Sequence, residues 1–341
     1  MEDRILHHYL EEFRGGADVH PLEAETLFDA LIICDNAFVI AELLSAWNQK
    51  GITEDEIFAL ASIMRSRMTR IASAHDRFVD VVGTGGSHSK TFNVSTAAAF
   101  VIAGAGIPVA KHGNRAATSV SGSADVLSLL GVNVEIAPRD SEQHLNELGI
   151  CFMFAPLFHS LSPTLAKARR TVAGPTIFNI LGPLCNPASA PSQLVGVWHR
   201  DLVELTANVL ARLGTNRSWV VHGTDGLDEA TLGGPTFVAE AVGGNVRTFE
   251  LIPEDLGSKT AAIDHLRVSS AEESAAIILS ILQGEAADRT ALDLVLINAA
   301  LPLYVAGAAK TQADAYAIAK ESLESGAALS KLKDLATATN R

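Results

Sequence analysis

The hydrophobic pattern divides the chain into a helical beginning and a long stretch of alternating strands and helices. In the first seventy-odd residues, apolar positions recur every three or four residues through Leu22 to Cys34 and Ala37 to Trp47. This is the period of helices that bury one face. Thr53-Glu54-Asp55-Glu56 has the form of a capping box before another helix. Because this region holds no catalytic grouping, it predicts a small helical packing domain.

From residue 78 onward, short apolar runs alternate with helical patterns. Such alternation predicts an α/β fold in which helices flank a mainly parallel sheet. Gly243-Gly244-Asn245 predicts the turn of an antiparallel hairpin. The predicted strands are 78–82, 107–111, 132–136, 151–154, 194–198, 219–222, 237–241 and 246–251. The predicted helices after the first domain include 123–130, 141–148, 165–172, 201–213, 269–282, 286–305 and 311–335.

A glycine-rich loop, Gly83-Thr84-Gly85-Gly86, joins the first of these strands to a buried helix that starts near Ser95. Backbone amides of the loop, with the hydroxyls and N–H groups of Asn93-Val94-Ser95-Thr96 at the positive end of the helix, predict a phosphate site. The next strand ends at Lys111-His112-Gly113-Asn114-Arg115, which predicts room for a second phosphate. Taken alone, the glycine run is also compatible with a tight connection between a strand and a helix.

Composition narrows the class of protein. The 341 residues are 48% hydrophobic and 19% charged, as in a soluble globular protein large enough for two domains. A net charge of −13 argues against general nucleic-acid binding, so local cations or metal ions must hold any polyphosphate. Three cysteines without C-x-x-C spacing predict free thiols and a cytoplasmic protein. The absence of an apolar signal core and of a long uncharged apolar run predicts no membrane partner.

Taken together, the motifs resemble the anthranilate phosphoribosyltransferase family, which joins anthranilate to phosphoribosyl diphosphate in tryptophan synthesis. Residues 83–127 keep nearly all of the family's G-T-G-G-D-G-x-x-T-F-N-x-S-T, K-H-G-N-R and G-S-A-D-V-L motifs. The resemblance implies a homodimer formed through the helical domain. It also implies that residues 161–187, which carry the family's T-I-F-N-x-L-G-P-L-x-N-P run, return to that domain. The predicted domains are therefore 1–75 with 161–187, and 76–160 with 188–341.

The resemblance also assigns a set of residues to phosphoribosyl diphosphate. These are Gly83, Gly86, Ser87, Thr91, Asn93, Val94, Ser95, Thr96, Lys111, His112, Gly113, Asn114, Arg115, Ala116, Ala117, Thr118, Ser119 and Ser123. Among them, Lys111 is the expected cation for a phosphate. His112 could equally be hydrogen-bonded structure, and Ser119, Ser121 and Ser123 could be turn residues or helix caps.

Asp228 and Glu229 follow the 219–222 strand through a glycine-containing loop, so they should lie at the same end of the sheet as the phosphate site. An Asp-Glu pair alone is more typical of a solvated loop. The family's G-L-D-E metal motif implies that Asp228 and Glu229 bind one Mg2+ ion, and that Glu229 and Ser95 bind a second. Magnesium suits this transfer because catalysis rests on neutralising the diphosphate.

Anthranilate needs a partner for its carboxylate beside apolar walls. By resemblance, Arg169 binds the carboxylate, and Asn114 and the Gly83 backbone complete the site. Without the resemblance, Arg169 would be interpreted as a surface charge beside Arg170. An aniline nitrogen needs little help from a base, so we expect no covalent nucleophile or triad.

Two departures from the family pattern leave other functions open. Ser87-His88 stands where the family has Asp-Gly, which predicts less dependence on a second Mg2+ ion, and Pro175 stands where the family usually has Arg. One alternative is therefore a phosphoribosyltransferase that acts on another aromatic acceptor. Another is a catalytically silent paralogue that binds nucleic acid or a regulatory partner, which the net charge of −13 opposes.

Overall fold

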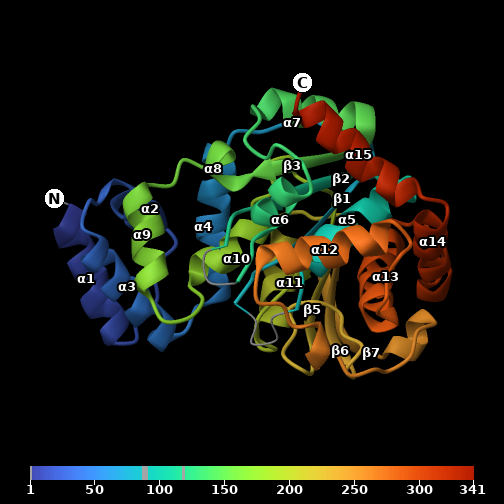
Figure 1. The fold of residues 1–341 in the computed structure, drawn as a ribbon. Coiled ribbons are helices and arrows are strands. Elements are labelled where there is room, and N and C mark those ends of the chain that lie inside the picture. The colour runs from blue at the N-terminus through green and yellow to red at the C-terminus, as the bar shows by residue number, and fades with distance from the viewer. Residues whose placement is uncertain (1, 87–90, 117–119) are drawn as a thin grey trace.

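In the computed structural model, which describes residues 2–86, 91–116 and 120–341, the described strands form one seven-stranded sheet (Figure 1). The spatial order is β3-β2-β1-β4-β5-β6-β7. The neighbouring strands β3, β2, β1, β4 and β5 pair in parallel. Strands β6 and β7 add an antiparallel hairpin at the β5 edge. The strands are β1 Val79–Gly83, β2 Val109–Gly113, β3 Ile150–Phe154, β4 Ser192–Gly196, β5 Arg217–Gly223, β6 Thr236–Val242 and β7 Asn245–Leu251. The predicted α/β class is confirmed.

Helices cover both faces of the sheet, which explains why its strands are apolar on both sides. On one face, Val79 and Val81 share a core with α5 Val94–Gly104, α12 Ala271–Leu282, α13 Arg289–Val305, α14 Gln312–Glu324 and α15 Ala327–Thr339. On the other face, Val195 and Val220 pack with α11 Leu202–Arg212. Shorter helices border the sheet: α6 Ser123–Leu129, α7 Pro138–Leu148, α8 Ala155–Phe158, η1 Pro253–Leu256 and η2 Asp264–Leu266.

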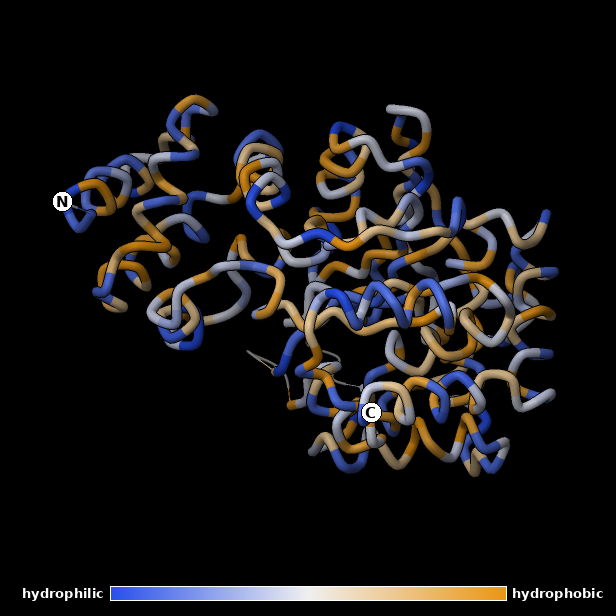
Figure 2. The backbone as a smooth tube through the Cα atoms, turned by 90° about the horizontal axis from the view of Figure 1, so that it is seen from above, coloured by the Kyte–Doolittle hydropathy of each residue, from blue (hydrophilic) through white to orange (hydrophobic). Residues whose placement is uncertain are grey.

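The N-terminal helices form a bundle that two later segments join. The bundle contains α1 Glu2–Arg14, α2 Ala24–Ile33, α3 Ala37–Lys50 and α4 Glu54–Arg67, and the Thr53–Glu56 capping box starts α4 as predicted. Helix α9 Pro163–Thr171 packs on α2 and α3, and α10 Ile177–Leu184 packs on α4. Figure 2 shows this smaller cluster beside the larger body in which the chain ends. This packing is what a discontinuous helical domain requires, and the domain boundaries stay a prediction.

Two predicted elements are wrong. Residues 132–136 form no strand, because Val132 N–H donates to the Leu127 carbonyl at 3.0 Å and Asn133 N–H to Thr339 Oγ1 at 3.0 Å. Residues 132–136 are instead an extended connection in which alternate side chains are buried, since Val132 and Val134 belong to the main core. Residues 311–335 form two helices, because Gly326 adopts φ +77° between α14 and α15.

The lengths of the described helices show whether any of them could span a membrane. The longest, α13, has 17 residues and lies in the core beside the sheet. Among the residues that the structure describes, no helix has the length and apolarity needed to cross a bilayer.

Candidate active site

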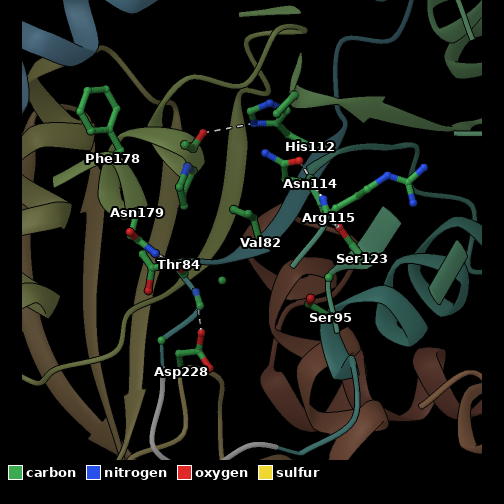
Figure 3. A pocket seen from close by; sticks show the side chains of 18 of the residues that line it. Val82, Thr84, Ser95, His112, Asn114, Arg115, Ser123, Phe178, Asn179 and Asp228 are labelled. Carbon is green, nitrogen blue, oxygen red and sulfur yellow. Dashed lines mark hydrogen bonds between the residues drawn. The ribbon is translucent and has the colours of Figure 1, made fainter. Parts of the chain in front are cut away.

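A cavity of about 510 Å³ opens at the carboxyl ends of β1, β2 and β5. Its walls come from the glycine-rich loop, the start of α5, the loop after β2, the loop after β5, and α9 and α10 (Figure 3). Most of the predicted site residues lie on these walls. They are Gly83, Gly86, Thr91, Asn93, Ser95, His112, Gly113, Asn114, Arg115, Ser123, Arg169, Asp228 and Glu229. Segments distant in sequence therefore meet at one end of the sheet.

Four described residues of the predicted set do not line the cavity: Val94, Thr96, Lys111 and Ala116. Val94 and Thr96 are fully buried on the inner side of α5, and the Ala116 N–H donates to Asp125 Oδ2 at 2.9 Å. Four more predicted residues, Ser87, Ala117, Thr118 and Ser119, lie outside the described residues, as does His88.

Lys111 lies beneath the site instead of facing into it. Its Nζ donates to the Val81 carbonyl at 2.7 Å and to Ser95 Oγ at 3.4 Å, and the residue is only 4% exposed. Burial lowers the pKa of Lys111 to about 8, while the charges of Asp80 and Glu229 oppose that shift. The expectation that Lys111 contacts a phosphate directly is therefore not supported by this geometry. Its cation lies between two buried carboxylates.

Hydrogen bonds to the carboxylates of Asp228 and Glu229 connect the loop after β5 to the two predicted phosphate-binding segments. Asp228 Oδ2 accepts a hydrogen bond from the Gly85 N–H at 3.0 Å, and Glu229 Oε1 accepts one from the Ser95 N–H at 3.2 Å. Burial raises the pKa of Glu229 well above its usual range, and the neighbouring charge of Asp228 raises it further. Two acidic groups are thus held together where a cation would lower their mutual repulsion.

The donor set fits magnesium. Carboxylate and hydroxyl oxygens are the hard ligands that Mg2+ prefers, and it commonly takes only one or two protein carboxylates. Among residues 2–86, 91–116 and 120–341 there is no group of three or more His, Cys, Asp and Glu side chains suited to a metal. Asp228, Glu229 and Ser95 would therefore need water or substrate oxygens to complete an Mg2+ coordination shell.

Asp80 is a buried acid that sequence reasoning missed. Its carboxylate accepts hydrogen bonds from the His112 N–H at 3.2 Å and from Asn186 Nδ2 at 2.7 Å. Burial raises the pKa of Asp80 to about 6, against the opposing charge of Lys111. A carboxylate inside an otherwise apolar strand was the available signal. Asp80 supports the K-H-G-N-R loop from below.

Asn93 has a defined orientation because its Oδ1 accepts from two hydroxyls. Ser121 Oγ donates to it at 2.6 Å, and Ser274 Oγ on α12 donates at 2.9 Å. The Ser274 hydroxyl also accepts from the Asn93 N–H at 2.9 Å. The Nδ2 group of Asn93 is therefore the part of the amide that can donate toward a ligand in the cavity. Ser274, which sequence reasoning also missed, fixes this orientation.

The end of the cavity beside the helical bundle carries cationic and aromatic groups. The Arg169 guanidinium lies 5.4 Å from the centre of the Phe178 ring, and its buried Nε has no hydrogen-bond partner in the part of the chain that the structure describes. Burial lowers the pKa of Arg169 to about 10, so the side chain stays protonated near neutral pH. Arg169 is therefore not the surface charge that its helical position alone would indicate.

Two neutral histidines line the same cavity. The His112 and His159 rings lie 5.0 Å apart, and burial lowers their pKa values to about 3 and about 4. His112 Nδ1 lies 3.2 Å from the Gly182 carbonyl, which can only accept, so Nδ1 carries the proton. His112 Nε2 is left as a buried hydrogen-bond acceptor with no partner among residues 2–86, 91–116 and 120–341. His112 is thus both hydrogen-bonded structure and part of the wall.

The burial of His159 predicts a pH-dependent loss of stability. Its pKa is about 4 in the folded protein against an ordinary value of 6.5. The unfolded chain therefore takes up the proton first, and the free energy of unfolding falls as the pH drops from about 6.5 to about 4, by roughly 3 kcal/mol. In urea titrations at several pH values across this window, His159→Gln should lose less stability than wild type. Parallel pH profiles for the two proteins would contradict the assignment.

Pro175, one of the two departures from the family pattern, packs against the glycine-rich loop. A Cβ at Gly86, which has φ +81°, would lie 2.6 Å from Pro175 Cγ. Asn48 on α3 donates to the Pro175 carbonyl at 2.7 Å. Asn179 on α10 donates to the Thr84 carbonyl at 3.1 Å, so two contacts connect the helical segments to this loop.

Comparison with known proteins agrees with this geometry. Residues 75–329 match the model of the glycosyl transferase family, a/b domain. An anthranilate phosphoribosyltransferase of Nitrobacter hamburgensis is 47% identical over 95% of this chain and 96% of its own, and one of Pelotomaculum thermopropionicum is 49% identical over 87% and 85%.

Solved structures show the same similarity. The crystal structure of the anthranilate phosphoribosyltransferase of Thermus thermophilus has a TM-score of 0.86 and 35% identity, and covers 98% of this chain and 99% of its own. The enzyme of Saccharomyces cerevisiae in complex with PRPP and Mg has a TM-score of 0.88 and 25% identity, and covers 99% and 98%. The chain therefore belongs to the anthranilate phosphoribosyltransferase family.

Proposed function

We propose that this chain transfers the phosphoribosyl group of 5-phospho-α-D-ribose 1-diphosphate to anthranilate, as a step of tryptophan biosynthesis. The products are N-(5-phosphoribosyl)anthranilate and diphosphate. The observation that supports this best is the pair of hydrogen bonds from Gly85 N–H to Asp228 and from Ser95 N–H to Glu229. They hold two carboxylates against both predicted phosphate-binding segments, and Arg169 lines the same cavity.

The diphosphate end of the site would bind negative charge through neutral donors. Gly86, Asn93 and Ser95 line this part of the cavity, and Asn93 Nδ2 and the Ser95 hydroxyl would donate to a phosphate there. Asp228 and Glu229 would hold one Mg2+ ion, and Glu229 with Ser95 a second. When bound, magnesium neutralises the charge that develops on the leaving diphosphate.

The acceptor end would orient anthranilate for direct attack. Arg169 would bind its carboxylate, and the Asn114 side chain and Gly83 backbone would position the amine. The amine nitrogen forms a bond to C1 of the sugar while the bond from C1 to the diphosphate oxygen breaks, and the nitrogen then loses one proton to solvent. Positioning and charge neutralisation are sufficient for this step, so no protein nucleophile is needed.

We also propose that the protein is a cytoplasmic homodimer formed through the helical bundle. Three large apolar side chains of the bundle region are exposed: Leu22 at 87%, Ile33 at 65% and Phe38 at 69%. Exposure of several such side chains in one region is typical of a protein interface. The free cysteines, which are buried in the described structure, agree with a reducing compartment.

Loss of anthranilate fluorescence in the presence of phosphoribosyl diphosphate and Mg2+ tests the proposal. We expect turnover that requires all three components and is abolished by chelating the metal. Parallel reactions with other aromatic amines and aromatic carboxylates test the alternative acceptor. Failure to consume anthranilate, by a folded protein that binds Mn2+, would overturn the choice of acceptor.

A further inference from the structure

Asn298 lies in the middle of α13, in the core behind the Asp228–Glu229 loop, and only 1% of the residue is exposed. Its side chain contacts both peptide groups of Ala230. The Ala230 N–H donates to Asn298 Oδ1 at 3.0 Å, and Asn298 Nδ2 donates to the Ala230 carbonyl at 2.8 Å. Nδ2 also donates to the Leu294 carbonyl at 2.9 Å, which holds the amide in this rotamer.

These hydrogen bonds act one residue away from the carboxylate pair. The Ala230 N–H belongs to the peptide that begins at Glu229, so Asn298 holds the orientation of the peptide group directly after the Glu229 side chain. A space of only about 10 Å³ separates Asn298 from Ser95, Asp228 and Glu229. That volume is at the lower limit for one water molecule, so little lies between the amide and the loop.

The loop after β5 packs between Asn298 and β4, so its backbone has little room to shift on that side. A Cβ at Gly196, at the end of β4, would lie 1.6 Å from the Asp228 carbonyl oxygen, so the loop already presses on the strand. Within the loop, Asp225 accepts from the Leu227 N–H at 3.2 Å and from the Thr231 hydroxyl. Asp225 therefore stabilises the loop through hydrogen bonds within it, and Asn298 stabilises it through hydrogen bonds from the core.

We propose that Asn298 is a positioning residue that holds Asp228 and Glu229 in the arrangement that binds divalent metal. This inference rests on the proposed function, because it concerns the same metal site. An amide is the side chain that can donate to a carbonyl and accept from an N–H on the same residue. An apolar residue here would leave the buried Ala230 peptide groups unpaired, and Asp would keep the acceptor but lose the donor.

Binding of Mn2+ alone, followed by its electron paramagnetic resonance signal, tests the proposal without requiring turnover. We expect Asn298→Ala to weaken Mn2+ binding roughly 10- to 100-fold, the usual effect of removing a group that orients metal ligands. Asn298→Asp, which keeps one of the two hydrogen bonds to Ala230, should fall between Asn298→Ala and wild type. The Mg2+ concentration for half-maximal turnover should rise in the same order, while the KM for anthranilate stays near that of wild type.

Ser322→Ala is the matched control. The Ser322 hydroxyl on α14 is buried and donates to the Val101 carbonyl at 2.7 Å, far from the loop after β5 in sequence and in contacts. Its loss should lower the thermal midpoint without changing Mn2+ affinity. Wild-type Mn2+ affinity in a folded Asn298→Ala or Asn298→Asp protein would overturn the proposal, as would failure of wild type to bind Mn2+. If wild type binds Mn2+ but does not use anthranilate, the proposed function fails while this titration still decides the role of Asn298.

Discussion

The Asp228→Asn, Glu229→Gln double variant should lose roughly 10³-fold or more in kcat/KM, because it removes the charge that would hold magnesium at the leaving diphosphate. The replacements keep oxygen acceptors for the Gly85 and Ser95 N–H groups, so the loop after β5 keeps its hydrogen bonds. The effect should be on chemistry and metal binding rather than on folding.

The stability of this variant separates a metal site from a structural acid pair. The pKa of Glu229 is raised in the folded protein, so the stability that this group contributes is present at low pH and is lost as the pH rises through the folded pKa. At neutral pH, neutral side chains at positions 228 and 229 should therefore leave the thermal midpoint unchanged or higher. A double variant that unfolds at markedly lower temperature would mean that the pair stabilises the fold.

Turnover and thermal unfolding of the double variant should be measured beside a control variant that also removes two negative charges. Glu250→Gln with Asp255→Asn removes two negative charges from exposed positions near β7. That control should keep wild-type activity and the same Mg2+ dependence. Near-normal turnover by the 228/229 double variant would remove the metal assignment from these residues.

Arg169→Gln should raise the KM for anthranilate roughly 10- to 100-fold, with a much smaller change for phosphoribosyl diphosphate. The guanidinium lies beside Phe178, its buried Nε has no hydrogen-bond partner among the described residues, and it stays protonated near neutral pH. A carboxylate in the cavity would give this charge a partner that the described residues do not supply to Nε. The loss of a charge-assisted hydrogen bond sets the expected magnitude.

Arg170 offers a control on the same helix. It follows Arg169 directly in α9 but is exposed, so Arg170→Gln makes the same chemical change outside the cavity. Steady-state kinetics with each substrate varied in turn should show an anthranilate-specific defect for position 169 and none for position 170. Equal effects at the two positions would point to the general charge of α9 rather than to a carboxylate contact.

The location of the site could be predicted from the sequence, whereas the direction of several side chains could not. Glycine runs and polar residues that follow apolar strands indicate the carboxyl end of a sheet, and the cavity lies there. The same logic places Lys111 at the end of β2, but its side chain turns under β1 to reach the Val81 carbonyl. The charges that face the Lys111 ammonium there, Asp80 and Glu229, lie on other elements.

Residues that act from another layer were also missed. Asn298 contacts a loop 68 residues earlier, and Ser274 contacts Asn93 across 181 residues. Both lie in apolar helices, where a single polar residue gives no indication of its partner. The strand predicted at 132–136 is wrong for a related reason: buried and exposed residues alternate there, but pairing with a neighbouring strand is a property of the assembled sheet.

The contact between Pro175 and Gly86 constrains how this enzyme can change. The proline ring occupies the space that any side chain at position 86 would need, at a Cγ distance of 2.6 Å from a hypothetical Cβ. Substitutions at the two positions are therefore epistatic. A route from this sequence to one with a larger residue at 86 must pass through a smaller or differently placed residue at 175, and saturation libraries that vary one position at a time would miss the viable pairs.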